Sequence, residues 1–201
     1  MATPTVETDG RRARRDRNRA AVIDAMITLL LEDGSIPPTE RIAERAGVSV
    51  SSVFRYFESL EDLQQQTVET HFERFGQLFD IPSLGEGSLD TRIARFVDAR
   101  ATLHAAVAPI ARIARAKQSE RSPISERLAA IRDLFIDQVR VHFAEELSTR
   151  TGAEHDDLAD AVDALTSFEA WDLLHSARGR SDRQIRRTWR TTIHSLLSFP
   201  E

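Results

Sequence analysis

Residues 39–63 read TERIAERAGVSVSSVFRYFESLEDL, which predicts two short helices joined by a tight turn and followed at once by a third. Thr39 is expected to cap the first helix, because its hydroxyl can accept a hydrogen bond from a free backbone N–H group. Gly47 stands where the chain must turn sharply, since glycine enters left-handed conformations at little cost. Ser49 and Ser59 are expected to cap the next two helices. These start and stop signals predict a helix-turn-helix.

The second of these helices has two contrasting faces. Val53 and Phe57 lie on an apolar face, whereas the other face shows small hydroxyls, one guanidinium and one phenol. Small residues let a helix lie deep in the major groove of DNA, and arginine can bind guanine through two hydrogen bonds. We therefore expect contacts with double-stranded DNA from Arg17, Thr39, Ser49, Ser51, Ser52, Phe54, Arg55 and Tyr56.

The same stretch resembles the DNA-binding segment of the TetR family of one-component bacterial repressors. The resemblance covers residues 17–64 and rests on Gly47-Val48-Ser49, Tyr56-Phe57 and Ser59 with Glu61-Asp62-Leu63. Two positions depart from the family pattern. Phe54 stands where the family often has tyrosine, and Leu60 stands where it often has lysine. Each departure removes a group that could bind phosphate, so it lowers the expected non-specific affinity without changing how the helix enters the groove.

Composition narrows the class of protein. The chain has 201 residues, of which 41% are hydrophobic, and no cysteine, so disulfides, thiolate nucleophiles and cysteine-bound zinc are excluded. No apolar run approaches the roughly 20 residues that span a bilayer, and the first residues lack a signal-peptide core. We expect a cytoplasmic protein with no membrane partner, no metal and no cofactor.

The charge is unevenly distributed. The net charge is −5, yet residues 11–57 carry nine arginines against six acidic residues. A basic end on an acidic chain is suited to a polyanion. Residues 1–16 are expected to form a disordered or basic arm, which either follows DNA phosphates or only keeps the protein soluble. Lys117 is the single lysine among 27 basic residues, so arginine is less informative here than elsewhere.

The remaining sequence predicts helices throughout. The fold class is all-α, with about nine helices: an N-terminal three-helix DNA-binding domain at 17–63 and a larger helical bundle at 64–201. The helix after Ser59 is expected to run to Phe79 with one apolar stripe. Pro109 is expected to kink or divide a later helix. Thr151 with Glu154, and Ser181 with Gln184, look like capping boxes.

Two C-terminal helices, at about 154–177 and 182–198, each present a broad apolar face. Pairing with a second copy would bury these faces in a four-helix bundle, although in a lone chain they could equally pack inward. The resemblance favours a homodimer that reads a near-palindromic operator. The expected interface residues are Leu158, Val162, Leu165, Ile185, Trp189 and Ile193.

Arg100 and His104 interrupt an apolar stripe, and a buried charge is costly unless it is paired. One reading pairs Arg100 with an acid such as Glu169 or Asp172. The other makes both residues the polar contacts of a mainly hydrophobic ligand pocket, which the resemblance also implies. The expected ligand-binding residues are Phe72, Phe75, Phe96, Arg100, His104, Phe135 and Trp171.

These observations favour a ligand-responsive transcriptional regulator, most simply a repressor that a small, mostly apolar effector releases from DNA. Catalysis is not expected, because no two histidines lie three or four residues apart and no motif pairs a nucleophile with a base. The alternative is a helical protein–protein adaptor or a ligand-binding bundle without specific DNA binding. Such a protein would use the same apolar faces without needing Arg55 or the basic arm.

Overall fold

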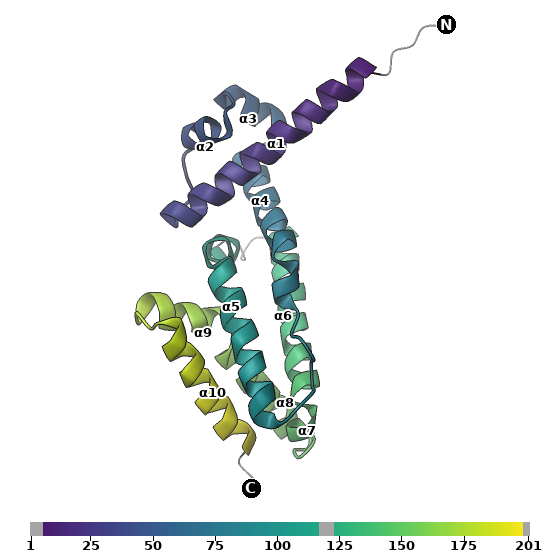
Figure 1. Cartoon of the computed structure of the whole chain (residues 1–201), viewed down its shortest axis with the longest axis vertical. Helices are drawn as coiled ribbons and strands as arrows, with labels where there is room; N and C mark the ends of the chain where they lie inside the picture. The colour runs from purple at the N-terminus through teal and green to yellow at the C-terminus, as the bar shows by residue number, and fades with distance from the viewer. Residues whose placement is uncertain (1–5, 117–122, 199–201) are drawn as a thin grey trace, which may run out of the picture. The chain divides into compact units, whose positions relative to one another are not determined.

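The computed structural model describes residues 6–116 and 123–198, and within these ranges the chain forms helices and no strand (Figure 1). The predicted all-α fold class is confirmed. The chain divides into two compact units, the first formed by Met1–Arg74 with Pro109–Ile124, and the second by Phe75–Ala108 with Ser125–Glu201. The division expected at residue 63 falls inside a helix that lies wholly in the first unit.

The first unit contains α1 (Val6–Asp33), α2 (Thr39–Ala46), α3 (Val50–Tyr56) and α4 (Leu60–Arg74). Apolar side chains from all four helices form its core, and among the most buried are Val22, Met26, Leu30, Ile42, Val53 and Leu63. α1 begins at Val6, so residues 6–16, the described part of the segment expected to be a disordered or basic arm, are helical. Residues 1–5 of the arm lie outside the described residues.

The turn between α2 and α3 follows the sequence prediction. Gly47 adopts φ 68° and ψ 31°, and the N–H of Val48 donates to the carbonyl of Ala43 at 3.0 Å. Ser49 caps α3 by accepting a hydrogen bond from the N–H of Ser52 at 3.2 Å. The Thr39 cap was wrong: Pro38 holds the cap position without a side-chain hydrogen bond, and Thr39 is the first residue of α2.

The start of α4 is also as predicted. Ser59 accepts from the N–H of Asp62 at 3.1 Å, and Asp62 accepts from the N–H of Glu58 at 2.9 Å. α4 nevertheless ends at Arg74, and a 3-10 turn covers Gly76–Phe79. The single helix expected to reach Phe79 is therefore interrupted.

The second unit contains most of α5 (Leu89–Ala116) and α6 (Pro123–His142), with α7 (Ala144–Leu147), α8 (Ala153–Leu165), α9 (Phe168–Asp172), a π-helical segment (Leu173–Ala177) and α10 (Asp182–Ser198). Pro109 lies inside α5, which continues to Ala116 without a break. Gly152, and not Thr151, precedes α8, with no side-chain cap. Ser181 and Gln184 do form the predicted capping box at α10.

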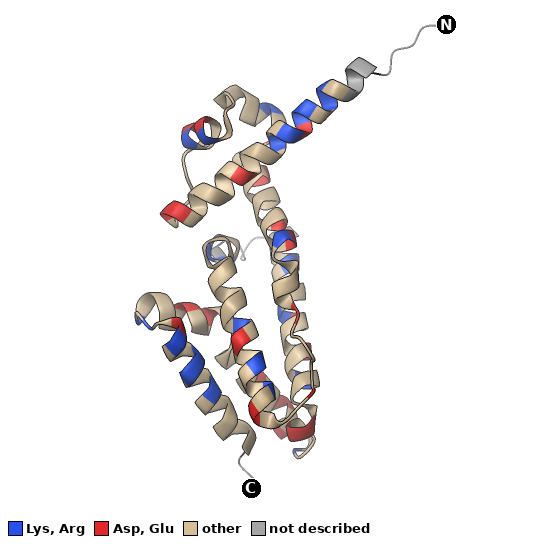
Figure 2. Ribbon diagram, in the orientation of Figure 1, with Lys and Arg blue, Asp and Glu red and all other residues tan. Residues whose placement is uncertain are grey.

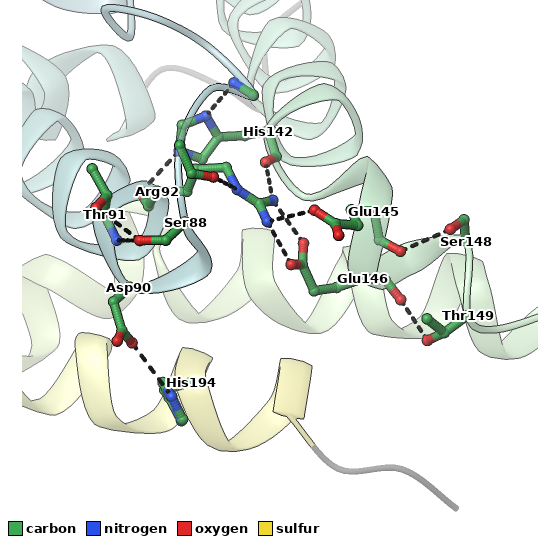
Figure 3. Close-up of polar contacts among 12 residues, drawn as sticks. Ser88, Asp90, Thr91, Arg92, His142, Glu145, Glu146, Ser148, Thr149 and His194 are labelled. Carbon is green, nitrogen blue, oxygen red and sulfur yellow. Dashed lines mark hydrogen bonds and ion pairs between the residues drawn. The ribbon is translucent and has the colours of Figure 1, made fainter.

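A buried arginine connects α5, α7 and the preceding loop (Figure 3). Arg92 is 3% exposed and forms two hydrogen bonds with Glu146, at 2.7 Å and 2.6 Å. It also donates to the carbonyls of Gly87 and His142, at 3.1 Å and 2.9 Å. The bond to Glu146 raises the pKa of Arg92. This network fixes one end of the second unit.

Candidate nucleic-acid interface

α3 turns one face inward and one outward. Val53 is 2% exposed and packs in the core of the first unit, together with Phe57 just after the helix. Ser51, Phe54 and Arg55 are exposed, and Phe54 keeps 54% of its surface open. Because two buried apolar side chains anchor this short helix in the core, its other face forms a rigid surface. That surface carries small hydroxyls and one guanidinium, the groups that read and grip a DNA groove.

Arg55 is held in place by its neighbours. Its Nη2 donates to Ser52 Oγ at 3.2 Å and lies 3.4 Å from Tyr56 Oη. Tyr56 Oη also accepts a hydrogen bond from Asn18 Nδ2 at 3.1 Å, so α1 positions the phenol beside the guanidinium. The bonds from Asn18 and then Arg55 lower the pKa of Tyr56. Sequence reasoning missed Asn18, which lies 38 residues from its partner.

A basic groove runs between the start of α1 and the turn that precedes α3. Arg11, Arg14, Arg15 and Asn18 recur at helical spacing and therefore share one face of α1. No acidic side chain is among the groove's lining residues, which are Arg11, Arg14, Arg15, Asn18, Gly47, Val48, Ser49, Ser52, Arg55 and Tyr56. Figure 2 shows the basic residues gathered on this part of α1. An anion such as a backbone phosphate suits this groove.

Two arginines of α2, Arg41 and Arg45, are paired with carboxylates at the end of α1. Arg45 forms two hydrogen bonds with Glu32, at 3.1 Å and 2.7 Å, and these lower the pKa of Glu32. Arg41 bonds Asp33 at 2.6 Å. These carboxylates offset the charge of the two α2 arginines, which lie outside the groove.

The remaining predicted DNA contacts are not among the residues that line the groove. Arg17 is exposed, but it is not among the residues that line the groove. Thr39 is half-buried at the start of α2, and Ser51 and Phe54 lie on the outer face of α3 beside the groove.

Comparison with known proteins bears on this surface. The family model described as bacterial regulatory proteins, tetR family, matches residues 38–66, which include α2, the turn and α3. The resemblance to the TetR family is thereby confirmed over this segment. The match supports a DNA-binding transcriptional regulator. No curated protein matches the sequence.

The fold of the chain is also found among solved structures. The crystal structure of a tetR-family transcriptional regulator from Streptomyces coelicolor matches with a TM-score of 0.69 and 16% sequence identity. The match covers 90% of this chain and 80% of the other. At this identity the likeness concerns the fold alone.

Five of the residues predicted to bind a ligand meet inside the second unit. Arg100 and His104 of α5 contact the ring of Phe135 on α6, with Phe96 and Trp171 around them. Phe75 is half-buried, whereas Phe72 lies in α4 and is a buried residue of the first unit.

The acid that acts on Arg100 is Asp163, through its charge, and not Glu169 or Asp172 as the sequence suggested.

The predicted interface residues need a correction. Val162, Ile185, Trp189 and Ile193 have no exposed surface in a single chain, so a second chain could not cover them. They pack inward, the alternative that the sequence left open. Leu158 and Leu165 of α8 are half-exposed.

Across residues 6–116 and 123–198, no helix combines the length and apolar character that crossing a membrane requires. Within the same ranges, no group of three or more histidine or carboxylate side chains is placed to hold a metal ion.

Proposed function

We propose that the chain is a TetR-family repressor that binds a near-palindromic operator as a homodimer and leaves it when a small, mostly apolar effector binds. The observation that carries the proposal is the exposed, pre-oriented Arg55 beside the basic groove of α1. An arginine held by Ser52 and Tyr56 loses little side-chain freedom when it contacts a base, so more of the interaction remains as affinity.

The two parts of this surface serve different purposes in the proposal. Arg55, with Ser51 and Ser52, reads base edges and neighbouring phosphates in the major groove. Arg11, Arg14 and Arg15 neutralise phosphates, which gives affinity for any sequence and makes that affinity depend on salt. Loss of Arg11, Arg14 or Arg15 should therefore weaken binding to all DNA alike, whereas loss of Arg55 should weaken binding to the operator most.

Residues 17–63 form the DNA-reading part in this proposal, and residues 64–201 the part that dimerises and binds the effector. α3 has only seven residues and reaches few base pairs. Two copies on half-sites about one helical turn apart would multiply the specificity. The partner would cover the outer sides of α8 and α10, where Leu158 and Leu165 remain half-exposed.

The effector acts by shifting a two-state equilibrium. In one state the paired α3 helices match two successive major grooves, and in the other they do not. A ligand shifts the balance only by its differential affinity, about 5.5 kcal/mol for a nearly complete change. Titrating candidate effectors into the operator complex tests this step, and ligands that bind without altering operator affinity would refute it.

The DNA-reading role is tested with Arg55→Ala. Operator fragments are first selected from genomic DNA by the wild-type protein, and affinities are then measured for the selected and for random DNA. Arg55→Ala should lose about 1–3 kcal/mol of discrimination. Arg14→Ala should instead reduce the slope of log K against log salt by about 0.9 on both DNAs.

Arg178→Ala is the matched control, because Arg178 is exposed and lies in the second unit. It should leave discrimination and the salt slope unchanged. If Arg55→Ala binds both DNAs as the wild type does, α3 is not the reading helix.

A further inference from the structure

The second unit encloses a positive charge that its own carboxylates compensate poorly. Arg100 of α5 is 1% exposed, and its guanidinium carbon lies 3.7 Å from the centre of the Phe135 ring. Its Nη2 donates to the carbonyl of Phe135 at 3.2 Å. Burial lowers the pKa of Arg100 to about 9, so the side chain is still charged at neutral pH.

Arg100 has no direct ion pair within the described part of the chain. Asp163 raises its pKa through charge alone, and burial in turn raises the pKa of Asp163. Two aromatic rings and one neutral carbonyl are weak compensation, because a buried ion loses the hydration that stabilised it. A structural arginine in this position would be expected to reach a carboxylate, as Arg92 does with Glu146.

Several other buried hydrogen-bond donors in this cluster of described residues also lack an acceptor. Among the described residues, Arg100 Nε, Trp171 Nε1 and Trp189 Nε1 are buried donors without an acceptor. Both indoles lie beside His104, with ring centroids at 6.4 Å and 6.2 Å, and His104 Nε2 contacts the carbonyl of Thr166 at 2.8 Å. Buried donors without acceptors are uncommon in native proteins. A group that offers only acceptor oxygens would satisfy them.

We propose that Arg100 binds the carboxylate of an aromatic or aliphatic acid, and that this acid is the chemical class of the effector. The inference rests on the proposed function, because it names what the effector domain recognises. The planar guanidinium matches a carboxylate in geometry, and the apolar rings around it suit the rest of such a molecule. A phosphate dianion, with more charge to desolvate, fits these rings less well.

The wall that carries Trp171 is locally irregular. α9 has five residues and continues into the π-helical segment Leu173–Ala177. π-helical turns are often found at functional sites. Trp171 stacks on the exposed His175 with ring centroids 4.6 Å apart, so the segment extends from the buried cluster to the surface. Movement of this segment would admit a ligand to Arg100.

Two kinds of measurement on the full-length protein test the assignment. Trp171 and Trp189 are the only two tryptophans of the chain, so intrinsic fluorescence reports on this cluster directly. Benzoate is compared with benzamide, which has the same ring without the charge. Benzoate should change the fluorescence and raise the Tm of the wild type, with an affinity at least tenfold above that of benzamide.

Arg100→Met should abolish the preference for benzoate. Without ligand its Tm should rise, because an uncompensated buried charge is replaced by an apolar side chain of similar length. Arg100→Lys should keep part of the preference, since it retains the charge without the planar fork. Arg187→Met, at an exposed position of α10, should behave as the wild type.

Three results would overturn the assignment. The first is equal behaviour of benzoate and benzamide on the wild type, including no effect of either. The second is an Arg100→Met protein that unfolds at lower temperature than the wild type, which would make Arg100 structural. The third is a response to inorganic phosphate but not to benzoate. By contrast, benzoate binding that leaves operator affinity unchanged would refute the repressor switch and leave the anion site standing.

Discussion

Removing Glu146 should strongly destabilise the second unit. Arg92 is 3% exposed, and its two shortest hydrogen bonds, 2.7 Å and 2.6 Å, both go to Glu146. Breaking a buried ion pair from one side typically costs about 3–5 kcal/mol, because the remaining charge stays buried. Arg92 keeps the carbonyls of Gly87 and His142 and lies 3.2 Å from Glu145, so we expect the lower end, about 3 kcal/mol, for Glu146→Ala.

Glu145→Ala is the matched control. The Glu145 side chain is 85% exposed, and exposed ion pairs contribute about 0–1 kcal/mol. Urea unfolding followed by circular dichroism gives both free energies, and a stability of about 5–15 kcal/mol leaves room to measure them. Equal losses for the two variants would show that burial does not set the strength of this network. Replacing Arg92 and Glu146 together by Met and Leu should recover most of the loss.

Two further predictions concern the turn and the buried histidine. Gly47→Ala should destabilise the first unit by about 1–2 kcal/mol, because the φ of 68° is unfavourable for alanine although its Cβ would meet no atom; an unchanged unfolding midpoint would contradict this. His142 should make the protein less stable in acid, because burial lowers its pKa. This stability is present above the unfolded pKa of about 6.5 and is lost as pH falls toward the folded value. In His142→Gln the loss over that range should be smaller, and an identical pH profile would refute the explanation.

Much of the first unit was predictable, because its turns and helix starts depend on residues close together in the sequence. Gly47 was identifiable because a left-handed turn selects glycine, and Ser49 and Ser59 because helix starts select hydroxyls. Each of these depends on residues within four positions along the chain. Thr39 failed as a cap because Pro38 already provides the extended entry to α2, so the helix begins at Thr39, one residue earlier than a Thr39 cap requires.

Features that depend on distant partners were not predictable. Asn18 gave no sign that it bonds Tyr56, because one asparagine in a basic helix has no distinctive pattern. The apolar stripe of α10 indicated that this face is buried, but not whether its own chain or a second copy covers it. Trp189 proves to be enclosed by its own chain. Arg92 was overlooked for the same reason, since its pairing with Glu146 spans 54 residues.

The continuity of α1 has a consequence for how its arginines meet a duplex. Because Val6–Asp33 is one helix, Arg11, Arg14 and Arg15 are held in angular phase with Asn18 and with the core below it. Each inserted residue turns the upstream part of a helix by about 100°. One extra residue after Asn18 would therefore rotate the cations off the groove at unchanged net charge, whereas four would return them to within about 40°. The affinity for the phosphates thus depends on helical phase as well as on the number of charges.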